Sequence, residues 1–218
     1  MRSTPLLFAY GVASLAMVAL ALAPGAGADN RPGTERSPRN PIGEAFPLVF
    51  DSESIWLDVV GDSLEVRGTF TLLCRTPIEE SIPLFFPLPV DSLLGGARMV
   101  SLAFRDDAGA AVPTHWEELP NAPGVRWWVP PCWGDSIVAE VVYRQQIKTE
   151  YARYILTTAR LWGRPLRWAG FEIRLPPGAE PLEFSYPFER RSEGGEVYYA
   201  YEVRDFFPDR DIVVRWRR

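Results

Sequence analysis

The sequence predicts an all-β protein, an antiparallel two-sheet β-sandwich that follows an N-terminal signal peptide. The first observation is that 21 of the 218 residues are proline, about twice the usual share, and proline is not tolerated inside helices. The second is that short apolar segments alternate with turn residues from Phe46 onward. The third is a composition of 47% hydrophobic and 13% aromatic residues, which supplies a core and argues against disorder.

The N-terminal segment has the pattern of an export signal. Arg2 precedes an apolar run over Leu6–Ala23, and Ala26-Gly27-Ala28 is the small-x-small pattern that signal peptidase recognises. Residues 1–28 are therefore predicted to be a signal peptide that is cleaved after Ala28, which places the protein in the periplasm or outside the cell. An apolar run of 18 residues is also near the minimum for a membrane span, so an uncleaved anchor is the alternative.

The rest of the chain divides into a leader and a domain. Residues 29–45 are polar, rich in proline and glycine, and have no periodicity, which is typical of a flexible leader. Residues 46–218 are predicted to form a single β-sandwich domain. Two small sandwiches that divide near Pro130-Pro131 are the alternative.

The first elements of this domain form a predicted hairpin. Ser54–Val60 is a strand, Gly61-Asp62-Ser63 is a turn, and Leu64–Cys74 is the second strand. Apolar residues occupy one face of the second strand and polar residues the other, which is typical of a half-buried antiparallel strand. The later predicted strands, separated by turn residues, are Ile82–Phe86, Arg98–Phe104, Ala111–Glu117, Val125–Val129, Ser136–Ile147, Tyr151–Thr158, Trp168–Leu175, Leu182–Tyr186, Glu196–Val203 and Ile212–Arg217.

Charge and ligand counts limit the classes of function. The formal net charge is −5, which excludes the electrostatic pattern of a nucleic-acid-binding protein and disfavours an anionic membrane surface. One histidine and two cysteines are too few for a zinc or haem site, so we expect no cofactor. Asp205, Asp209 and Asp211 are the one acidic cluster that could suggest a metal site, but Arg210 stands where a calcium loop requires glycine, so turn and strand-entry roles are predicted for them.

Ser63 is the one residue that suggests catalysis. Gly61-Asp62-Ser63-Leu64 resembles the nucleophile block of the GDSL esterases and lipases, and the resemblance implies that Ser63 is the nucleophile. In that family a late Asp-x-x-His supplies the base. Here the only histidine is His115, and Val112 stands three residues before it. A serine without a base is a poor nucleophile, so we predict a turn residue and no catalytic site.

Three tryptophans and Cys132 lie around one proline-rich turn, and the other cysteine, Cys74, ends a predicted strand. Trp127, Trp128 and Trp133 are candidate ligand-binding residues, because exposed tryptophans on a β-sandwich can stack on sugar rings. Trp127 and Trp128 are neighbours on a strand, so at least one of them is expected in the core. Cys74 and Cys132 form a disulfide or remain two buried thiols, since sequence separation does not fix the distance that the bond requires.

Short motifs along the domain resemble a known class of proteins. Phe86-Pro87-Leu88-Pro89, Tyr143-Arg144-Gln145, and Tyr154-x-Leu156-Thr157-Thr158 with Trp162 are similar to uncharacterised exported bacterial β-sandwich domains. The resemblance extends from Ile55 to the C-terminus. It implies the fold and an exported location, and it implies no catalytic residue or cofactor.

The sequence predicts a non-enzymatic protein with a binding or structural role in the cell envelope or outside the cell. An envelope protein or a glycan is the expected partner, and no nucleic acid. The alternatives are a carbohydrate-binding module that uses the tryptophans and an esterase built on Ser63. Exposed tryptophans would favour the first alternative, and the second requires a histidine within hydrogen-bond reach of Ser63.

Overall fold

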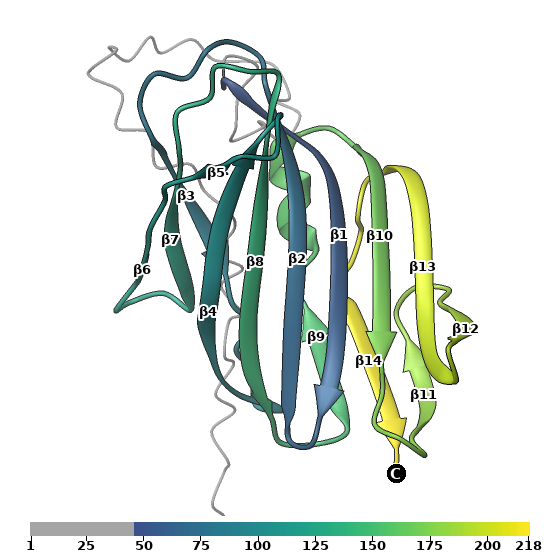
Figure 1. Ribbon diagram of the computed structural model, residues 1–218. Coiled ribbons are helices and arrows are strands. Elements are labelled where there is room, and N and C mark those ends of the chain that lie inside the picture. Colours follow the sequence, from purple (N-terminus) through teal and green to yellow (C-terminus); the bar gives the residue numbers. More distant parts are fainter. Residues whose placement is uncertain (1–45) are drawn as a thin grey trace, which may run out of the picture.

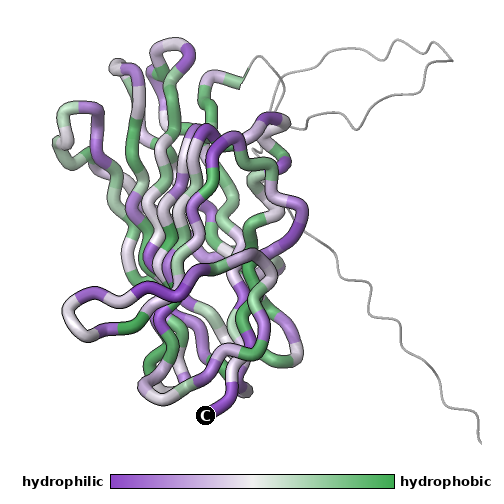
Figure 2. Tube along the Cα trace, turned by 90° about the vertical axis from the view of Figure 1, so that its right-hand side faces the viewer, coloured by the Kyte–Doolittle hydropathy of each residue, from purple (hydrophilic) through white to green (hydrophobic). Residues whose placement is uncertain are grey.

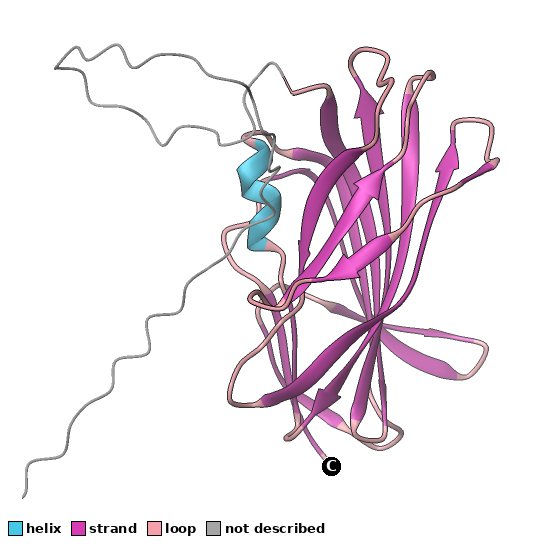
Figure 3. Cartoon of the chain, turned by 90° about the vertical axis from the view of Figure 1, so that its left-hand side faces the viewer, coloured by secondary structure: helices cyan, strands magenta, loops and turns pink. Residues whose placement is uncertain are grey.

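The computed structural model describes residues 46–218 and is nearly all β, with three open sheets (Figures 1 and 3). The large sheet has the strand order β12-β13-β10-β1-β2-β8-β4-β5. Its strands are β1 (Leu48–Val60), β2 (Ser63–Cys74), β4 (Leu94–Asp106), β5 (Ala111–Val112), β8 (Ser136–Ile147), β10 (Leu166–Arg174), β12 (Glu189–Glu193) and β13 (Glu196–Phe206).

Two three-stranded sheets make up the rest of the described strands. One has the order β3-β7-β6, with β3 (Ile82–Pro87), β7 (Gly124–Val129) and β6 (Trp116–Glu118). The other has the order β11-β14-β9, with β11 (Glu180–Phe184), β14 (Ile212–Arg217) and β9 (Tyr151–Tyr154). Figure 1 shows both behind the large sheet, in a sandwich-like arrangement. The all-β prediction is thus confirmed, whereas the layer opposite the large sheet is two sheets instead of one.

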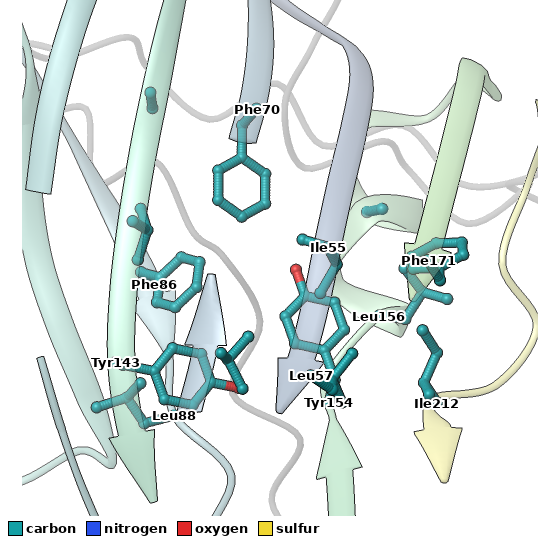
Figure 4. Packing of buried hydrophobic residues seen from close by; sticks show 14 of the residues in the cluster. Ile55, Leu57, Phe70, Phe86, Leu88, Tyr143, Tyr154, Leu156, Phe171 and Ile212 are labelled. Atoms are coloured by element: carbon teal, nitrogen blue, oxygen red, sulfur yellow. The ribbon is translucent and has the colours of Figure 1, made fainter. Parts of the chain in front are cut away.

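The core lies between the large sheet and the two small ones. Phe70 of β2 meets Phe86 of β3 and Trp127 of β7 at ring-centroid distances of 5.9 and 6.1 Å. Tyr143 of β8 meets the same Phe86 ring at 6.1 Å. Figure 4 shows this packing in the same close-up as Tyr154 of β9. Apolar and polar residues alternate along the strands (Figure 2), so each buried face contributes every second side chain to the core.

The first hairpin is built as the sequence predicts. Val60 pairs with Ser63 across the two-residue connection Gly61-Asp62, and Gly61 adopts a φ of +63°, which favours glycine. The inward side chains of β2 are buried from Leu64 to Leu72 at every second position. The alternating pattern of this strand therefore identified its core face.

Several boundaries differ from the prediction. Strand β1 begins at Leu48 and not at Ser54, and a bulge between Phe50 and Ser52 hides its alternation. The predicted strand Ala111–Glu117 is two short strands, β5 and β6, because Pro113 between them has no N–H to donate. Strand β12 was not predicted, since its sequence ERRSE has no apolar alternation.

The prediction for Tyr151–Thr158 is wrong in its second half. Strand β9 ends at Tyr154, and a 3₁₀ helix, η1 (Thr157–Trp162), follows and ends at Gly163 with a φ of +68°. Among residues 46–218, η1 is the only helix, and none is long and apolar enough to cross a bilayer.

The prediction of a purely antiparallel protein is also wrong at one pair. Strands β1 and β10 run parallel, with Ser52 opposite Trp168 and Asp58 opposite Arg174. A parallel pair needs a long connection, and eight strands and η1 lie between these two in the sequence. Hairpin patterns reveal only local antiparallel pairs, so this contact had no signal in the sequence. The predicted signal peptide and leader, residues 1–45, lie outside the described residues.

Candidate functional site

A row of charged side chains crosses the large sheet near one end. Arg174 of β10 is opposite Asp58 of β1, Asp58 is opposite Glu65 of β2, and Glu65 is opposite Arg144 of β8. Side chains of directly opposed residues lie on one face of a sheet. These four residues alternate in sequence with buried neighbours such as Leu57 and Val66, so the charged row faces away from the core.

The charges in this row are paired. Arg67 contacts Asp58 at 3.1 Å and Glu65 at 3.0 Å, and the Nε of Arg144 donates to Glu65 at 2.8 Å. Hydrogen bonds from Arg144 and Arg67 lower the pKa of Glu65 below its usual value, against the opposing effect of partial burial. Arg174 is held less closely, at 3.9 Å from Asp58.

The row forms one wall of a cavity with a volume of about 1080 Å³. The cavity lies where β1 and β10 end, beside the turn after β10 and the β12–β13 hairpin. The turn is set by Pro176-Pro177-Gly178, in which Gly178 has a φ of +80°. The hairpin turns at Gly194-Gly195, both with positive φ. Prolines and glycines therefore fix the loops that enclose the cavity.

The second wall of the cavity is apolar. Val60 and Val197 line it and are 69% and 37% exposed, so both present apolar surface to solvent. Leu175 and Tyr199 also line it, and Tyr199 packs on the ring of Phe184 at a centroid distance of 5.0 Å. The cavity thus combines a charged wall and an apolar wall, as ligand sites commonly do.

Arg190 of β12 completes the lining of the cavity. It is the register partner of Tyr199, so the two side chains lie on the same face of the hairpin. Within residues 46–218, Arg190 has no ion pair or hydrogen bond through its side chain. Its neighbour Arg191 faces the other way and pairs with Glu202 at 3.0 Å. No sequence signal marks Arg190, because a charged pentapeptide without apolar alternation indicates neither a strand nor a site.

The three candidate tryptophans lie in different surroundings. Trp127 is 1% exposed and packs on Phe70, Phe86 and Phe104, so its ring belongs to the core and offers no face to a ligand. Trp128 is half-buried and stacks on His115 with ring centroids 4.2 Å apart. Trp133 is 70% exposed in the loop after β7. The structure therefore does not bring these three rings to one surface.

Cys74 and Cys132 are bonded in a disulfide, which confirms one of the two alternatives. The bond joins the end of β2 in the large sheet to the loop after β7 in a small sheet. Next to it, Ile78 and Cys132 form an isolated bridge with hydrogen bonds of 2.8 and 2.9 Å. The loop that carries Trp133 is therefore anchored at its base.

Ser63 lines the large cavity, but no histidine lies in hydrogen-bond contact with it. Its hydroxyl donates to Asp62 at 3.5 Å, in the turn itself. His115, the only histidine of the chain, is stacked on Trp128 of a different sheet. The base that a serine nucleophile needs is thus not in contact with Ser63.

The late aspartates hold local structure. Asp211 accepts hydrogen bonds from the backbone N–H groups of Leu156 and Thr157 at 3.0 Å each, and from Arg153. These contacts bind the end of β9 and the start of η1 to the entry of β14. Asp209 accepts from the Tyr186 hydroxyl at 3.1 Å and pairs with Arg210. Turn and strand-entry roles account for both residues.

A buried acid lies in the core, away from the large cavity. Glu53 continues the inward alternation of Ile55 and Leu57 in β1, so its side chain lies on the inner face of the sheet, opposite Phe70. The Tyr154 hydroxyl donates to its Oε2 at 3.4 Å, and its Oε1 has no partner among the described residues. Burial raises the pKa of Glu53 to about 8, against the smaller lowering effect of the Tyr154 hydrogen bond. At neutral pH this carboxyl group is therefore mostly protonated.

Comparison with known proteins shows similarity of fold only. No family model and no curated protein matches the chain. A candidate nutrient-binding protein from Legionella pneumophila has a TM-score of 0.57 and 13% identity, over 78% of this chain and 67% of that one. Native yeast LTA4 hydrolase has a TM-score of 0.52 and 13% identity, over 84% of this chain. An M1 zinc metallopeptidase from Deinococcus radiodurans has a TM-score of 0.49 and 16% identity, over 78% of this chain.

This chain spans 31% of the yeast hydrolase and 43% of the bacterial peptidase. The similar structures therefore include a candidate binding protein and parts of larger enzymes. At these identities the likeness defines the class of fold, an all-β domain with a large sheet, and leaves activity to be argued from the residues.

Proposed function

We propose that the protein is an exported, non-enzymatic binding protein with a β-sandwich architecture, and that its ligand occupies the cavity between β1, β10 and the β12–β13 hairpin. The observation that carries the proposal is this cavity of about 1080 Å³, with one charged and one apolar wall. The disulfide supports an oxidising location, in agreement with the predicted signal peptide. The Legionella protein of similar fold, a candidate nutrient-binding protein, is consistent with such a role.

The contacts of Ser63 and His115 support the non-enzymatic part of the proposal. Hydrolysis by a serine needs a base at about 2.6–3.2 Å from the hydroxyl. Among residues 46–218, the hydrogen bond of the Ser63 hydroxyl is to Asp62 of its own turn, and the His115 ring lies on Trp128. If the wild type hydrolyses p-nitrophenyl esters and Ser63→Ala does not, the protein is an esterase with Ser63 as nucleophile, and the non-enzymatic part of the proposal is contradicted.

The binding role is tested by thermal unfolding of the purified protein with a library of amino acids, peptides, sugars and fatty acids. We expect at least one compound to raise the Tm of the wild type but not of Val60→Glu, because the new charge occupies the apolar wall. Val90→Glu is the matched control, since Val90 is as exposed as Val60 and lies outside the cavity. A library without any stabilising compound would refute the proposal.

The exposed ring of Trp133 favours a second candidate function, a carbohydrate-binding module. The same screen separates the two. A sugar whose effect persists in Val60→Glu and is lost in Trp133→Ala would replace the cavity with the loop after β7 as the binding site.

A further inference from the structure

The carboxylates around the cavity all have guanidinium partners. Asp58 and Glu65 share Arg67, and Glu65 also binds Arg144. The remaining two acids of the lining are paired as well, Glu180 with Arg217 and Glu196 with Arg174 at 3.7 Å. A cationic ligand would have to displace an arginine to reach Asp58 or Glu65, the two carboxylates of the charged row.

The guanidinium groups of the cavity are not all satisfied. Arg190 is exposed in β12 and has no side-chain partner among the described residues. A guanidinium group offers five N–H donors in a planar fork that fits a carboxylate or phosphate with two parallel hydrogen bonds. The donors left over in this cavity therefore suit an oxyanion.

The apolar wall adds a second requirement. Val60, Val197 and Tyr199 line the same cavity as Arg190, and the prolines at 176, 177 and 181 extend this surface. Burying apolar area contributes about 25 cal/mol per Å², so a ligand with an apolar body gains affinity that a small inorganic anion does not. The volume of about 1080 Å³ accommodates a ligand of some tens of atoms.

On the basis of the proposed binding function, we propose that the cavity binds an amphiphile whose oxyanion group, a carboxylate or phosphate, is held by Arg190, and whose apolar body lies on Val197 and Tyr199, which share the face of Arg190 in the β12–β13 hairpin. Arg190 is the residue that determines this specificity, because it supplies the donors that no protein carboxylate occupies. Neutral and cationic amphiphiles of the same length bind less tightly, since they leave Arg190 unpaired.

The test compares four ligands with the same eight-carbon chain by isothermal titration calorimetry, below their micelle concentrations. Octanoate and octyl phosphate carry the oxyanion, octyl glucoside is neutral, and octyltrimethylammonium is cationic. We expect the two anions to bind the wild type, and Arg190→Gln to weaken them at least tenfold, the loss of one charge-assisted contact. The ratio of the two anion affinities then shows which of the two oxyanions the site prefers.

Arg191→Gln is the matched control, because Arg191 is the next residue of β12 but pairs with Glu202 on the opposite face. This variant is expected to bind both anions as the wild type does. Equal binding of the neutral or cationic ligand, or anion binding that is unchanged in Arg190→Gln, would overturn the oxyanion assignment. If the oxyanion assignment fails but a library compound still loses its stabilising effect in Val60→Glu, the proposed binding function stands. If no compound binds in either experiment, both the binding function and the oxyanion assignment are refuted.

Discussion

Glu53 is a carboxyl group whose environment in the folded protein differs strongly from its environment in the unfolded chain. Its pKa of about 8 exceeds the ordinary value of 4.5, so the folded protein keeps a proton that the unfolded chain releases between these two pH values. Stability is therefore full below about pH 4.5 and falls as the pH rises to 8. The difference in pKa corresponds to a loss of roughly 4–5 kcal/mol of unfolding free energy above pH 8.

We expect Glu53→Gln to remove this loss, because an amide keeps the shape of the side chain without an ionisable group. Urea unfolding of the wild type and the variant from pH 5 to 9 measures it. Glu140→Gln, at an exposed site where Glu140 pairs with Arg105, should keep the wild-type slope. The same pH dependence in Glu53→Gln and in the wild type would show that another group is responsible.

Sequence patterns predict the burial of some residues, but they do not predict the burial of Glu53 or the role of Arg190. The burial of Phe70 follows from alternation along Leu64–Cys74. Glu53 is in phase with the inward residues Ile55 and Leu57, but an acid at such a position is ordinarily exposed, so its burial has no sequence signal. Arg190 was missed for a different reason, since an unpaired guanidinium is a property of its surroundings and not of its neighbours in sequence.

At the scale of elements, β2 joins the first hairpin to the β3-β7-β6 sheet. Phe70 is 3% exposed and its ring contacts Phe50, Phe86 and Trp127, which come from three other strands. We expect Phe70→Ala to reduce the unfolding free energy by about 3–5 kcal/mol, because the cavity left behind cannot be filled by three neighbours on separate strands.

Thr69→Ala is the control for this substitution, since Thr69 lies on the outward face of the same strand. We expect Thr69→Ala to reduce the unfolding free energy by well under half as much as Phe70→Ala does. Urea denaturation of both variants gives the two values. Equal losses would mean that the outward face of β2 is covered as completely as the inner one.

Elements with regular alternation were predicted well, and elements fixed by distant contacts were not. Strand β8 has the predicted bounds Ser136–Ile147 because its side chains alternate throughout. Strand β12 consists of charged, exposed residues and exists through its backbone pairing with β13. The helix η1 replaces the end of a predicted strand where Asp211, more than fifty residues later, accepts the N–H groups of Leu156 and Thr157.

At the scale of the whole molecule, local sequence patterns do not predict how the layers contact each other. Hairpins are local and were found, but the parallel pair of β1 and β10 and the division of the second layer into two sheets depend on contacts between distant segments. The two cysteines were the only sequence feature with a bearing on this scale. Their bond fixes β2 of the large sheet to the loop after β7 of a small one.

The disulfide should therefore contribute strongly to the stability of the whole fold. It joins residues 58 positions apart, and closing a loop of this length in the unfolded chain corresponds to about 4 kcal/mol. We expect the double variant Cys74→Ala/Cys132→Ala to lose an amount of this order in urea unfolding. A reducing agent should bring the wild type down to the same stability and leave the double variant unchanged, because the variant has no bond to break. If the double variant is as stable as the oxidised wild type, the Ile78–Cys132 bridge and the core hold the two layers together without the bond.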